Sequence, residues 1–240
     1  MNDIVNIASK LVSAFKKNKL ISPIPLRFTS NINNANKLRV MCESKMNIPI
    51  LGFKAGGTGI PMLKKLGEKE PFYASVYKEN IIDKNKKVKI NKYTLGIELE
   101  VCYLVKKNFF QSKEKITSKN IYKYLSFMAP CIEVVGYRQR KKGLKYLGDL
   151  CSDFGGNVKF IIGKKKKFKK IKIGNLKTKL GCKNSKQLVF GNTKTVYVNP
   201  INSCKFVLNK IRKDKISLNC NFFIFTGSTV GVVPILKKGL

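Results

Sequence analysis

The segment "LGIELEVCYLV", residues 95–105, places two acidic side chains inside a β-branched, apolar stretch. In an extended strand, the side chains of Ile97 and Leu99 face one side, and those of Glu98 and Glu100 face the other. Two strand rises separate the acidic positions, so their carboxylates project from one surface roughly 7 Å apart. The segment therefore predicts a central strand that carries a pair of acids.

A third glutamate occupies a similar position in "APCIEVVGYR", residues 129–138, where Glu133 lies between Ile132 and Val134. The chain has only 13 acidic residues against 49 basic ones, and three of the acids lie in core-like strands. If Glu98 and Glu100 were the only acids in the strands, a solvated strand face would explain them. In this chain, however, a solvated face should be rich in lysine. Because unpaired buried carboxylates are costly, we expect a positive charge to compensate them.

The composition limits the chemistry that these acids can serve. The chain contains no histidine, which excludes Ser-His-Asp and Cys-His nucleophiles and imidazole zinc sites. Convergent carboxylates without histidine or cysteine ligands suit a hard cation such as Mg²⁺ or Mn²⁺. The sequence thus favours a metal site with Lewis-acid chemistry.

The net charge of +36 raises a second possibility, a basic protein that binds nucleic acid or an anionic surface. Only five of the basic residues are arginines, and the lysines are spread along the chain. The densest run, residues 163–174, lies between two glycines and is typical of a solvated hairpin or loop. A nucleic-acid partner is the minor alternative.

The remaining composition indicates a cytoplasmic protein. Seven cysteines without a C-x-x-C pair suit free thiols in a reducing compartment. We find no targeting segment and no apolar run long enough to cross a bilayer, so no membrane association is expected.

Hydrophobic periodicity and turn residues predict helices first and strands later, an α+β class. The predicted helices are 1–20, 31–46, 60–69, 117–128 and 199–213. The predicted strands are 50–57, 72–82, 87–93, 95–105, 131–138, 158–163, 170–174, 194–199 and 220–235.

Several motifs together resemble the 2-keto-4-pentenoate hydratases of the fumarylacetoacetate hydrolase superfamily. In addition to the two glutamate segments, they are "GFKAGGTG" (52–59), "CSDFGGNVKFIIG" (151–163), "NPINSCKFVLNKI" (199–211) and "FIFTGST" (223–229). The resemblance implies a mixed β-roll or barrel of the fumarylacetoacetate hydrolase type with flanking helices. Residues 1–71 would form a helical N-terminal segment with the Gly-Phe-Lys strand, and residues 72–240 the catalytic roll, which we expect to lack the family's last strands. The family also implies a homo-oligomer.

The resemblance implies roles for individual residues. Glu98, Glu100 and Glu133 would hold one Mg²⁺ or Mn²⁺, and Lys54 would transfer protons. The residues expected to bind substrate are Gly227, Ser228 and Arg138, and those expected to support the pocket wall are Asp153 and Asn157.

The implied activity is that of a lyase from the breakdown of aromatic or related acids. It would hydrate 2-hydroxypenta-2,4-dienoate (2-keto-4-pentenoate), or a close analogue, to a 4-hydroxy-2-oxo acid through a metal-stabilised enolate. Decarboxylation of a 2-oxo-3-hexenedioate-type acid is the alternative within the family, because the decarboxylases share the metal ligands. Some hydratases have an acid shortly after the position of Pro71, where this chain offers only Glu70 or Tyr73 as nearby polar groups.

Overall fold

The computed structural model describes residues 2–139, 143–171, 173–181 and 188–235. Its α-helices are α1 (Asn2–Lys17), α2 (Leu26–Thr29), α3 (Ile32–Ser44), α4 (Ile60–Lys65), α5 (Leu147–Ser152) and α6 (Pro200–Lys213). In this part of the chain, no helix combines the length and the apolar character that crossing a membrane requires. The predicted α+β class is confirmed.

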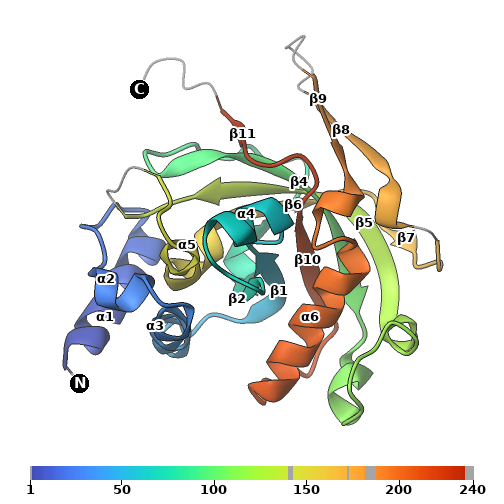
Figure 1. The fold of residues 1–240 in the computed structure, drawn as a ribbon, viewed down its shortest axis with the longest axis horizontal. Helices are drawn as coiled ribbons and strands as arrows, with labels where there is room; N and C mark the ends of the chain where they lie inside the picture. The colour runs from blue at the N-terminus through green and yellow to red at the C-terminus, as the bar shows by residue number, and fades with distance from the viewer. Residues whose placement is uncertain (1, 140–142, 172, 182–187, 236–240) are drawn as a thin grey trace.

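The strands form one large curled sheet and a separate hairpin (Figure 1). They are β1 (Ile50–Gly56), β2 (Phe72–Tyr77), β3 (Ile81–Ile82), β4 (Thr94–Val105), β5 (Leu125–Gly136), β6 (Asn157–Ile162), β7 (Lys166–Lys167), β8 (Lys177–Gly181), β9 (Leu188–Asn192), β10 (Phe222–Ser228) and β11 (Val233–Pro234). The order across the sheet is β2-β1-β10-β4-β5-β6-β3, with β11 added to β4 and β7 added to β5. The hairpin β8-β9 projects from one end of the molecule (Figure 1).

The long antiparallel pair β4-β5 is the centre of the sheet. Both strands have 12 residues, which is long for a strand in a globular protein. On the β4 side, β10 is antiparallel to β4 and parallel to β1, so the C-terminal part of the chain lies between two earlier strands. The sheet therefore brings the strand of Lys54 and the strands of the three glutamates into one surface.

Two of the apolar clusters pack helices against the sheet. One contains aromatic side chains of β1, β4 and β10 packed against α6, with Phe53 and Phe222 in edge-to-face contact at a ring separation of 5.8 Å. The other joins α1 and α3 to the sheet through residues such as Leu11, Leu38 and Tyr77. Each buried large side chain of this kind contributes about 1.5–3 kcal/mol to folding, so these clusters hold α1, α3 and α6 against the sheet.

Helices α3 and α6 begin where their sequences carry caps. The side chain of Asn31 accepts hydrogen bonds from the amides of Asn33 and Asn34, and that of Asn199 accepts one from Ile201. Pro200 occupies the first turn of α6, where its missing amide hydrogen costs nothing. The predicted helices at 31–46 and 199–213 are confirmed within a few residues at each end.

The helix predicted at 117–128 is wrong. Residues 121–123 form a single 3₁₀ turn, and from Leu125 the chain is extended in β5. The hydroxyl of Thr117 accepts hydrogen bonds from the amides of Lys119 and Asn120, as a helix cap would, but the turn does not continue. Pairing of β5 with β4 overrides the local helical preference.

Two strand predictions are also wrong. Residues 87–93 form no strand, and the segment ends in a turn in which Thr94 donates its amide hydrogen to the carbonyl of Asn91. Residues 194–199 form a 3₁₀ turn and an irregular link in which Tyr197 and Val198 have φ values of +46° and +69°. Of the strand predicted at 170–174, residue 172 lies outside the described residues, and residues 173–175 form a 3₁₀ turn.

Candidate metal centre

The glutamates of β4 and β5 converge in the structure. One carboxylate oxygen from each of Glu98, Glu100 and Glu133 lies within 4.8 Å of the other two. Glu98 and Glu133 are direct partners across the β4-β5 ladder, and Glu100 lies two residues further along β4 on the same face. Like charges opposite each other destabilise a sheet, so this arrangement requires a compensating cation.

The ammonium of Lys54 lies against this cluster. Its Nζ atom is 2.6 Å from Oε1 and 2.8 Å from Oε2 of Glu133, and 3.2 Å from the carbonyl oxygen of Gly155. Lys54 lies on β1, three strands from β5 in the sheet order. In a flat sheet, this separation would be roughly 14 Å between backbones. The curl of the sheet therefore brings Lys54 to Glu133.

The cluster raises the pKa values of its carboxyl groups. Burial, and then the charge of Glu133, raise the pKa of Glu98 to about 7. Burial likewise raises the pKa of Glu100 to about 7 and that of Glu133 to about 8, against the opposing effect of Lys54. Burial alone would lower the pKa of Lys54, but the charges of the three glutamates outweigh it and raise that pKa above its usual value.

The polar atoms of the cluster fit a divalent cation. Neither carboxylate oxygen of Glu100 has a hydrogen-bond partner of ordinary geometry, although both are buried. Three ionised carboxylates and one ammonium leave two negative charges in excess, which is the charge that one Mg²⁺ or Mn²⁺ would neutralise. Oxygen ligands alone are the donor set that such hard cations prefer.

A β-bulge in β10 completes this side of the site. Phe225 pairs with Cys102 and Ser228 with Glu100, so β10 has one residue more than β4 between these pairs. Gly227 lies in the bulge with a φ of +104°, a conformation that side chains rarely adopt. The backbone amide of Gly227 lies close enough to Glu100 to lower the pKa of that carboxyl group.

A cavity of about 530 Å³ opens beside the cluster. Lys54 and Glu98 are the charged residues that line it, among the residues that the structure describes. Glycines form much of its described wall, and they are Gly56, Gly57, Gly59, Gly136, Gly155, Gly156, Gly191, Gly227 and Gly231. A wall of glycines leaves room for a small ligand next to the glutamates and exposes backbone amides to it.

Two of the three residues expected to bind substrate line this cavity, and one does not. Gly227 and Ser228 are on the wall, where the hydroxyl of Ser228 donates a hydrogen bond to the carbonyl oxygen of Gly231 at 3.0 Å. Arg138 is buried outside it. Its guanidinium is 3.0 Å from Asp153 and 2.5 Å from the carbonyl oxygen of Asn157. The structure therefore places Arg138 in a buried ion pair, away from the described residues that line the cavity.

Asp153 and Asn157 lie behind the cavity wall. Asp153 accepts hydrogen bonds from the backbone and side chain of Arg138, and Asn157 donates one from its side chain to the carbonyl of Ser75 at 3.0 Å. The residues between them include Gly155, whose φ is +70° and whose carbonyl accepts from Lys54. Asp153 and Asn157 therefore flank two glycines that line the cavity, Gly155 and Gly156, and their support of the pocket wall stays a prediction.

Some residues of the site carried no signal strong enough to be predicted. Thr58 and Phe190 line the cavity, and Phe190 reaches it from the β8-β9 hairpin, which the sequence analysis did not predict. The alternation of exposed lysines with Thr178 and Leu180 in β8 is the pattern that could have indicated this hairpin. Thr58 follows two glycines in the segment 52–59, in which the family resemblance implies a role for Lys54 alone.

No protein-family model matches the chain, and no curated protein matches it in sequence. Among solved structures, it is similar to 4-oxalocrotonate decarboxylase from Pseudomonas putida, complexed with calcium and acetate. The TM-score is 0.79 at 16% sequence identity, over 98% of this chain and 90% of that chain. The same enzyme complexed with magnesium and adipate gives a TM-score of 0.76 at the same identity and coverage.

A weaker similarity is found to 5-carboxymethyl-2-hydroxymuconate delta-isomerase from Mycobacterium smegmatis. Its TM-score is 0.53 at 14% identity, over 78% of this chain and 70% of that chain. Similarities at this level of identity show the fold. The predicted fold class, a mixed α+β roll with a curled sheet and flanking helices, is therefore confirmed.

Proposed function

We propose that this fold carries a divalent-metal-dependent lyase that acts on a 2-oxo or 2-hydroxy-dienoic acid. The leading reaction is the hydration of 2-hydroxypenta-2,4-dienoate to a 4-hydroxy-2-oxo acid. The single observation that carries the proposal is the convergence of three glutamate oxygens within 4.8 Å beside an open cavity. A solved structure of similar fold is complexed with magnesium, which supports Mg²⁺ as the ion.

The residues present have distinct roles in this proposal. Glu98, Glu100 and Glu133 would hold the cation, which supplies Lewis acidity toward the carboxylate and 2-oxo oxygens of a bound acid. The Nζ atom of Lys54 faces the cluster from the cavity side and would hold or deliver a proton there. The Gly227 amide and the Ser228 hydroxyl would orient the substrate carboxylate.

Decarboxylation of a 2-oxo-hexenedioate is the second candidate. It is favoured by the fold similarity to 4-oxalocrotonate decarboxylase, which extends over 98% of this chain. Hydration needs a group that activates water, and Glu70 and Tyr73, the polar groups nearest Pro71, are not among the described residues that line the cavity. Glu70 forms an ion pair with Lys210 at 2.9 Å, and the hydroxyl of Tyr73 donates to Asp214.

A turnover assay tests both candidates. Purified protein is given 2-hydroxypenta-2,4-dienoate or 2-oxohex-3-enedioate with Mg²⁺ or with a chelator, and ultraviolet absorbance and CO₂ release are recorded. We expect metal-dependent loss of the diene absorbance, reduced at least a hundredfold in Glu98→Gln. The matched control is Glu79→Gln, which changes an exposed glutamate and should retain the parent rate.

The outcomes separate the candidates. Metal-dependent release of CO₂ from the dicarboxylate would replace the hydratase by the decarboxylase. Turnover that is equal with chelator and with Mg²⁺, or that survives in Glu98→Gln, would contradict the metal-dependent lyase altogether.

A further inference from the structure

The turn Phe154–Gly156 lies beside the cavity and consists of three consecutive residues with positive φ. The values are +52° for Phe154, +70° for Gly155 and +73° for Gly156. Glycine adopts this conformation readily, whereas a bulky side chain is rarely found in it. If the backbone shape alone mattered, a glycine at position 154 would serve as well. The side chain of Phe154 therefore contributes something that the turn needs.

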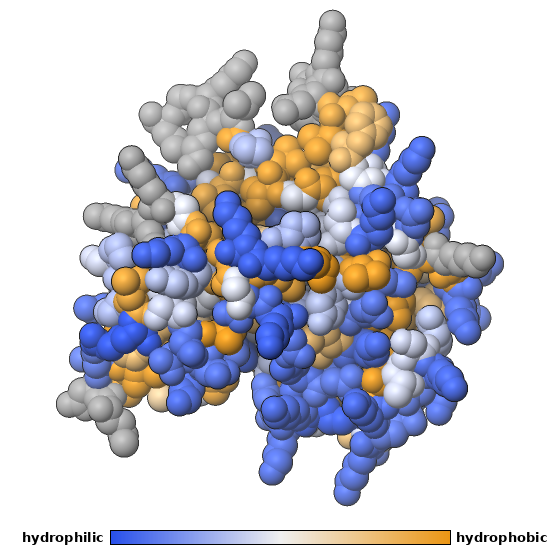
Figure 2. Space-filling model, in the orientation of Figure 1, coloured by the Kyte–Doolittle hydropathy of each residue, from blue (hydrophilic) through white to orange (hydrophobic). Residues whose placement is uncertain are grey.

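The ring of Phe154 is anchored in the core between α1 and α3. Its exposed fraction is 0%, and it belongs to the apolar cluster that contains Leu11 of α1 and Leu38 of α3. The Phe15 ring of α1 lies 4.8 Å from it, and the Tyr77 ring of β2 lies 6.4 Å from it. Figure 2 shows hydrophobic surface concentrated at a different place, the end of the molecule from which the β8-β9 hairpin projects. Phe154 is thus an internal anchor and not part of an exposed patch.

The guanidinium of Arg138 packs against the same rings. It lies 4.7 Å from the centroid of the Phe15 ring and 5.9 Å from that of the Phe154 ring. Arg138 is itself held by Asp153, which directly precedes Phe154 and accepts hydrogen bonds from the backbone and the side chain of Arg138. The start of the turn is therefore fixed by a buried ion pair and by aromatic contacts.

The other end of the turn meets Lys54. The carbonyl oxygen of Gly155 accepts a hydrogen bond from the Lys54 ammonium at 3.2 Å. A methyl group on Gly155 would lie 3.0 Å from Cβ of Ala74 and 3.3 Å from Cδ of Lys54, so the turn packs closely against the lysine side chain. Gly155 and Gly156 line the cavity, as Lys54 does. The turn therefore connects the apolar core to the charged end of the cavity.

The Lys54 ammonium has three hydrogens to donate, and the structure provides three acceptors. Two are the carboxylate oxygens of Glu133, at 2.6 and 2.8 Å, and the third is the carbonyl of Gly155. Glu133 is also one of the residues proposed to hold the cation, so its oxygens would serve both the ammonium and the ion. Among the described residues, the Gly155 carbonyl is the acceptor of Lys54 that lies outside the glutamate cluster.

We propose that Phe154 is a positioning residue for Lys54. Its ring anchors the turn in the core, and the turn presents the Gly155 carbonyl that holds the Lys54 ammonium at the cavity. Phe154 is not among the described residues that line the cavity, so it acts through Gly155. The effect on catalysis rests on the proposed function, because the position of Lys54 matters only if it transfers a proton. A displacement of about 1 Å at such a group can lower a rate about a hundredfold.

Three variants with the same chemical change test the proposal, and they are Phe154→Leu, Phe15→Leu and the control Phe109→Leu. Phe109 is also fully buried, but it packs against Phe222 and Tyr124 in the cluster that contains α6. The readout is Mg²⁺-dependent exchange of the C3 hydrogens of 2-oxopentanoate for deuterium in D₂O, followed by NMR. This exchange reports proton transfer next to the 2-oxo group and does not depend on which candidate reaction is correct.

We expect the maximal exchange rate to fall about tenfold in Phe154→Leu and about threefold in Phe15→Leu. Phe109→Leu should exchange at the parent rate. The acid concentration that gives half the maximal rate, and the Kd of Mg²⁺ measured by calorimetry, should stay at the parent values in all three variants. A loss confined to the maximal rate means that the proton-transferring group is displaced while the metal and the acid still bind.

A second measurement requires neither metal nor turnover. Phe154→Leu and Lys54→Met are combined in one protein, and the free energy of unfolding is measured in urea without metal. If the turn holds Lys54, the losses of the two single variants should not add in the double variant. The losses of Phe109→Leu and Lys54→Met should add, because Phe109 has no described contact with Lys54 or with the turn.

The outcomes distinguish the positioning role from the proposed function. An equal loss of rate in Phe109→Leu, or weaker binding of Mg²⁺ and acid in Phe154→Leu, would overturn the positioning role, since either result reflects general destabilisation. Additive losses of Phe154→Leu and Lys54→Met would overturn it as well. A parent protein without Mg²⁺-dependent exchange would overturn the proposed function, and the metal-free double variant would still decide whether Phe154 fixes Lys54.

Discussion

Lys54 is the cation that partly offsets the charge of the glutamate cluster, in which Glu100 and Glu133 are buried and Glu98 is partly buried. Its removal leaves carboxylates that are buried and unpaired, a change that costs about 3–5 kcal/mol in comparable ion pairs. We expect Lys54→Met to lower the free energy of unfolding by about 3 kcal/mol in urea titrations without metal. Mg²⁺ should restore part of this loss, because it neutralises carboxylates that the Lys54 ammonium no longer neutralises.

The surface pair of Lys210 and Glu70 supplies the comparison, with an N–O distance of 2.9 Å and both partners partly exposed. Lys210→Met should cost less than about 1 kcal/mol, because solvent screens such pairs. Equal losses in the two variants would contradict a buried charge cluster that depends on Lys54.

The raised pKa values of the cluster predict a pH dependence of stability. Burial raises the pKa values of Glu98 and Glu100 to about 7 and that of Glu133 to about 8, above the ordinary value of 4.5. Between the ordinary pKa of 4.5 and the raised values of about 7 to about 8, the folded state binds more protons than the unfolded state. These groups therefore make the metal-free protein less stable as the pH rises through this range. No histidine is present to titrate in this range.

Mg²⁺ must displace these protons, so its effect has the opposite sign. We expect the increase in melting temperature caused by Mg²⁺ to be larger at pH 8.5 than at pH 6, measured by scanning calorimetry. In Glu100→Gln the difference between the two pH values should shrink. An effect of Mg²⁺ that does not change with pH would show that the ion binds elsewhere.

Single residues differ in how far the sequence could place them. Glu98, Glu100 and Glu133 were predictable as a group, because strand alternation fixes their faces and three acids in apolar strands are rare in a chain so rich in lysine. The position of Arg138 was not predictable. Whether an arginine meets a ligand or a buried aspartate depends on the packing of β6 and α5, which the residue spacing does not encode.

At the level of elements, the bulge of β10 predicts an unusual sensitivity at Gly227. A methyl group at this position would overlap the side chain of Thr58, and φ is +104°. A left-handed conformation alone costs an alanine roughly 1–2 kcal/mol. We expect Gly227→Ala to lose more than this in urea unfolding, and to bind Mg²⁺ more weakly because the amide near Glu100 shifts.

Gly67 offers a matched control, because its φ is +73° and nothing lies within 4 Å of the added methyl group. Gly67→Ala should show the backbone cost alone and unchanged Mg²⁺ binding. If the two variants are equally stable, the contact with Thr58 does not constrain the bulge.

Elements with strong local signals were predicted and those decided by distant contacts were not. Asn199 and Pro200 mark the start of α6, and local chemistry is sufficient there. Residues 117–128 carry an equally good cap in Thr117, but β4 supplies a partner strand from Leu125 onward. In the segment 194–199, the β-branched pattern suggested a strand. The side chain of Asn192, which accepts a hydrogen bond from the Lys194 amide, starts a 3₁₀ turn instead.

At the scale of the molecule, the curl of the sheet creates the site and is the feature least visible in the sequence. Lys54 and Glu133 are 79 residues apart in the chain and three strands apart in the sheet, yet they form an ion pair. Alternation predicts which side chains share a face, but not how far that face bends. The resemblance to a known family assigned Lys54 and the three glutamates to one reaction, but it did not indicate the ion pair between Lys54 and Glu133.

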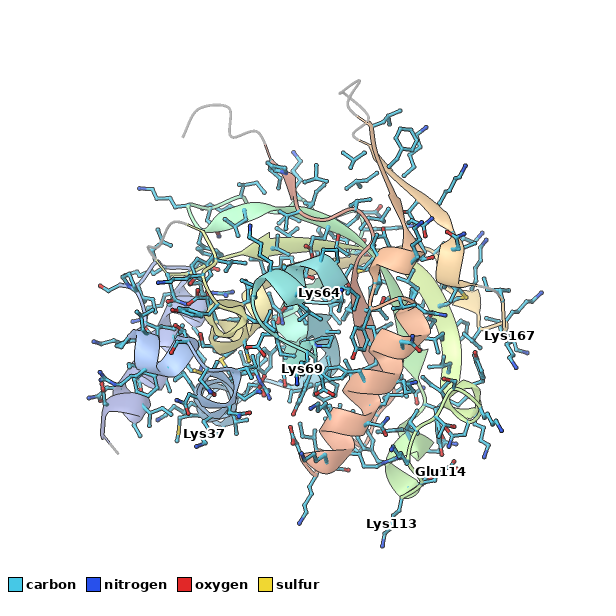
Figure 3. All side chains as sticks on the ribbon, in the orientation of Figure 1. Lys37, Lys64, Lys69, Lys113, Glu114 and Lys167 are labelled. Carbon is cyan, nitrogen blue, oxygen red and sulfur yellow. The ribbon has the colours of Figure 1, made fainter. Side chains whose placement is uncertain are left out.

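The net charge of +36 predicts how the stability of the whole protein depends on salt. With 49 basic and 13 acidic residues, at least 36 basic side chains have no acidic partner of their own. Lys37 on α3, Lys64 on α4 and Lys167 on β7 illustrate how widely the charges are spread (Figure 3). Such self-repulsion destabilises the compact state, and salt screens it.

We therefore expect the melting temperature to rise by about 2–4 °C between 0.02 M and 0.3 M sodium chloride, which corresponds to about 1 kcal/mol for a chain of this size. Replacing the exposed residues Lys164, Lys167 and Lys169 by glutamate lowers the net charge by six, from +36 to +30. This variant should melt higher than the parent in low salt and respond less to added salt. Arginine at the same three positions retains the charge and should behave as the parent does. A melting temperature that falls with added salt would contradict this prediction, because it would mean that attractive ion pairs dominate. The composition argues against that outcome, since 13 acidic residues cannot pair with 49 basic ones.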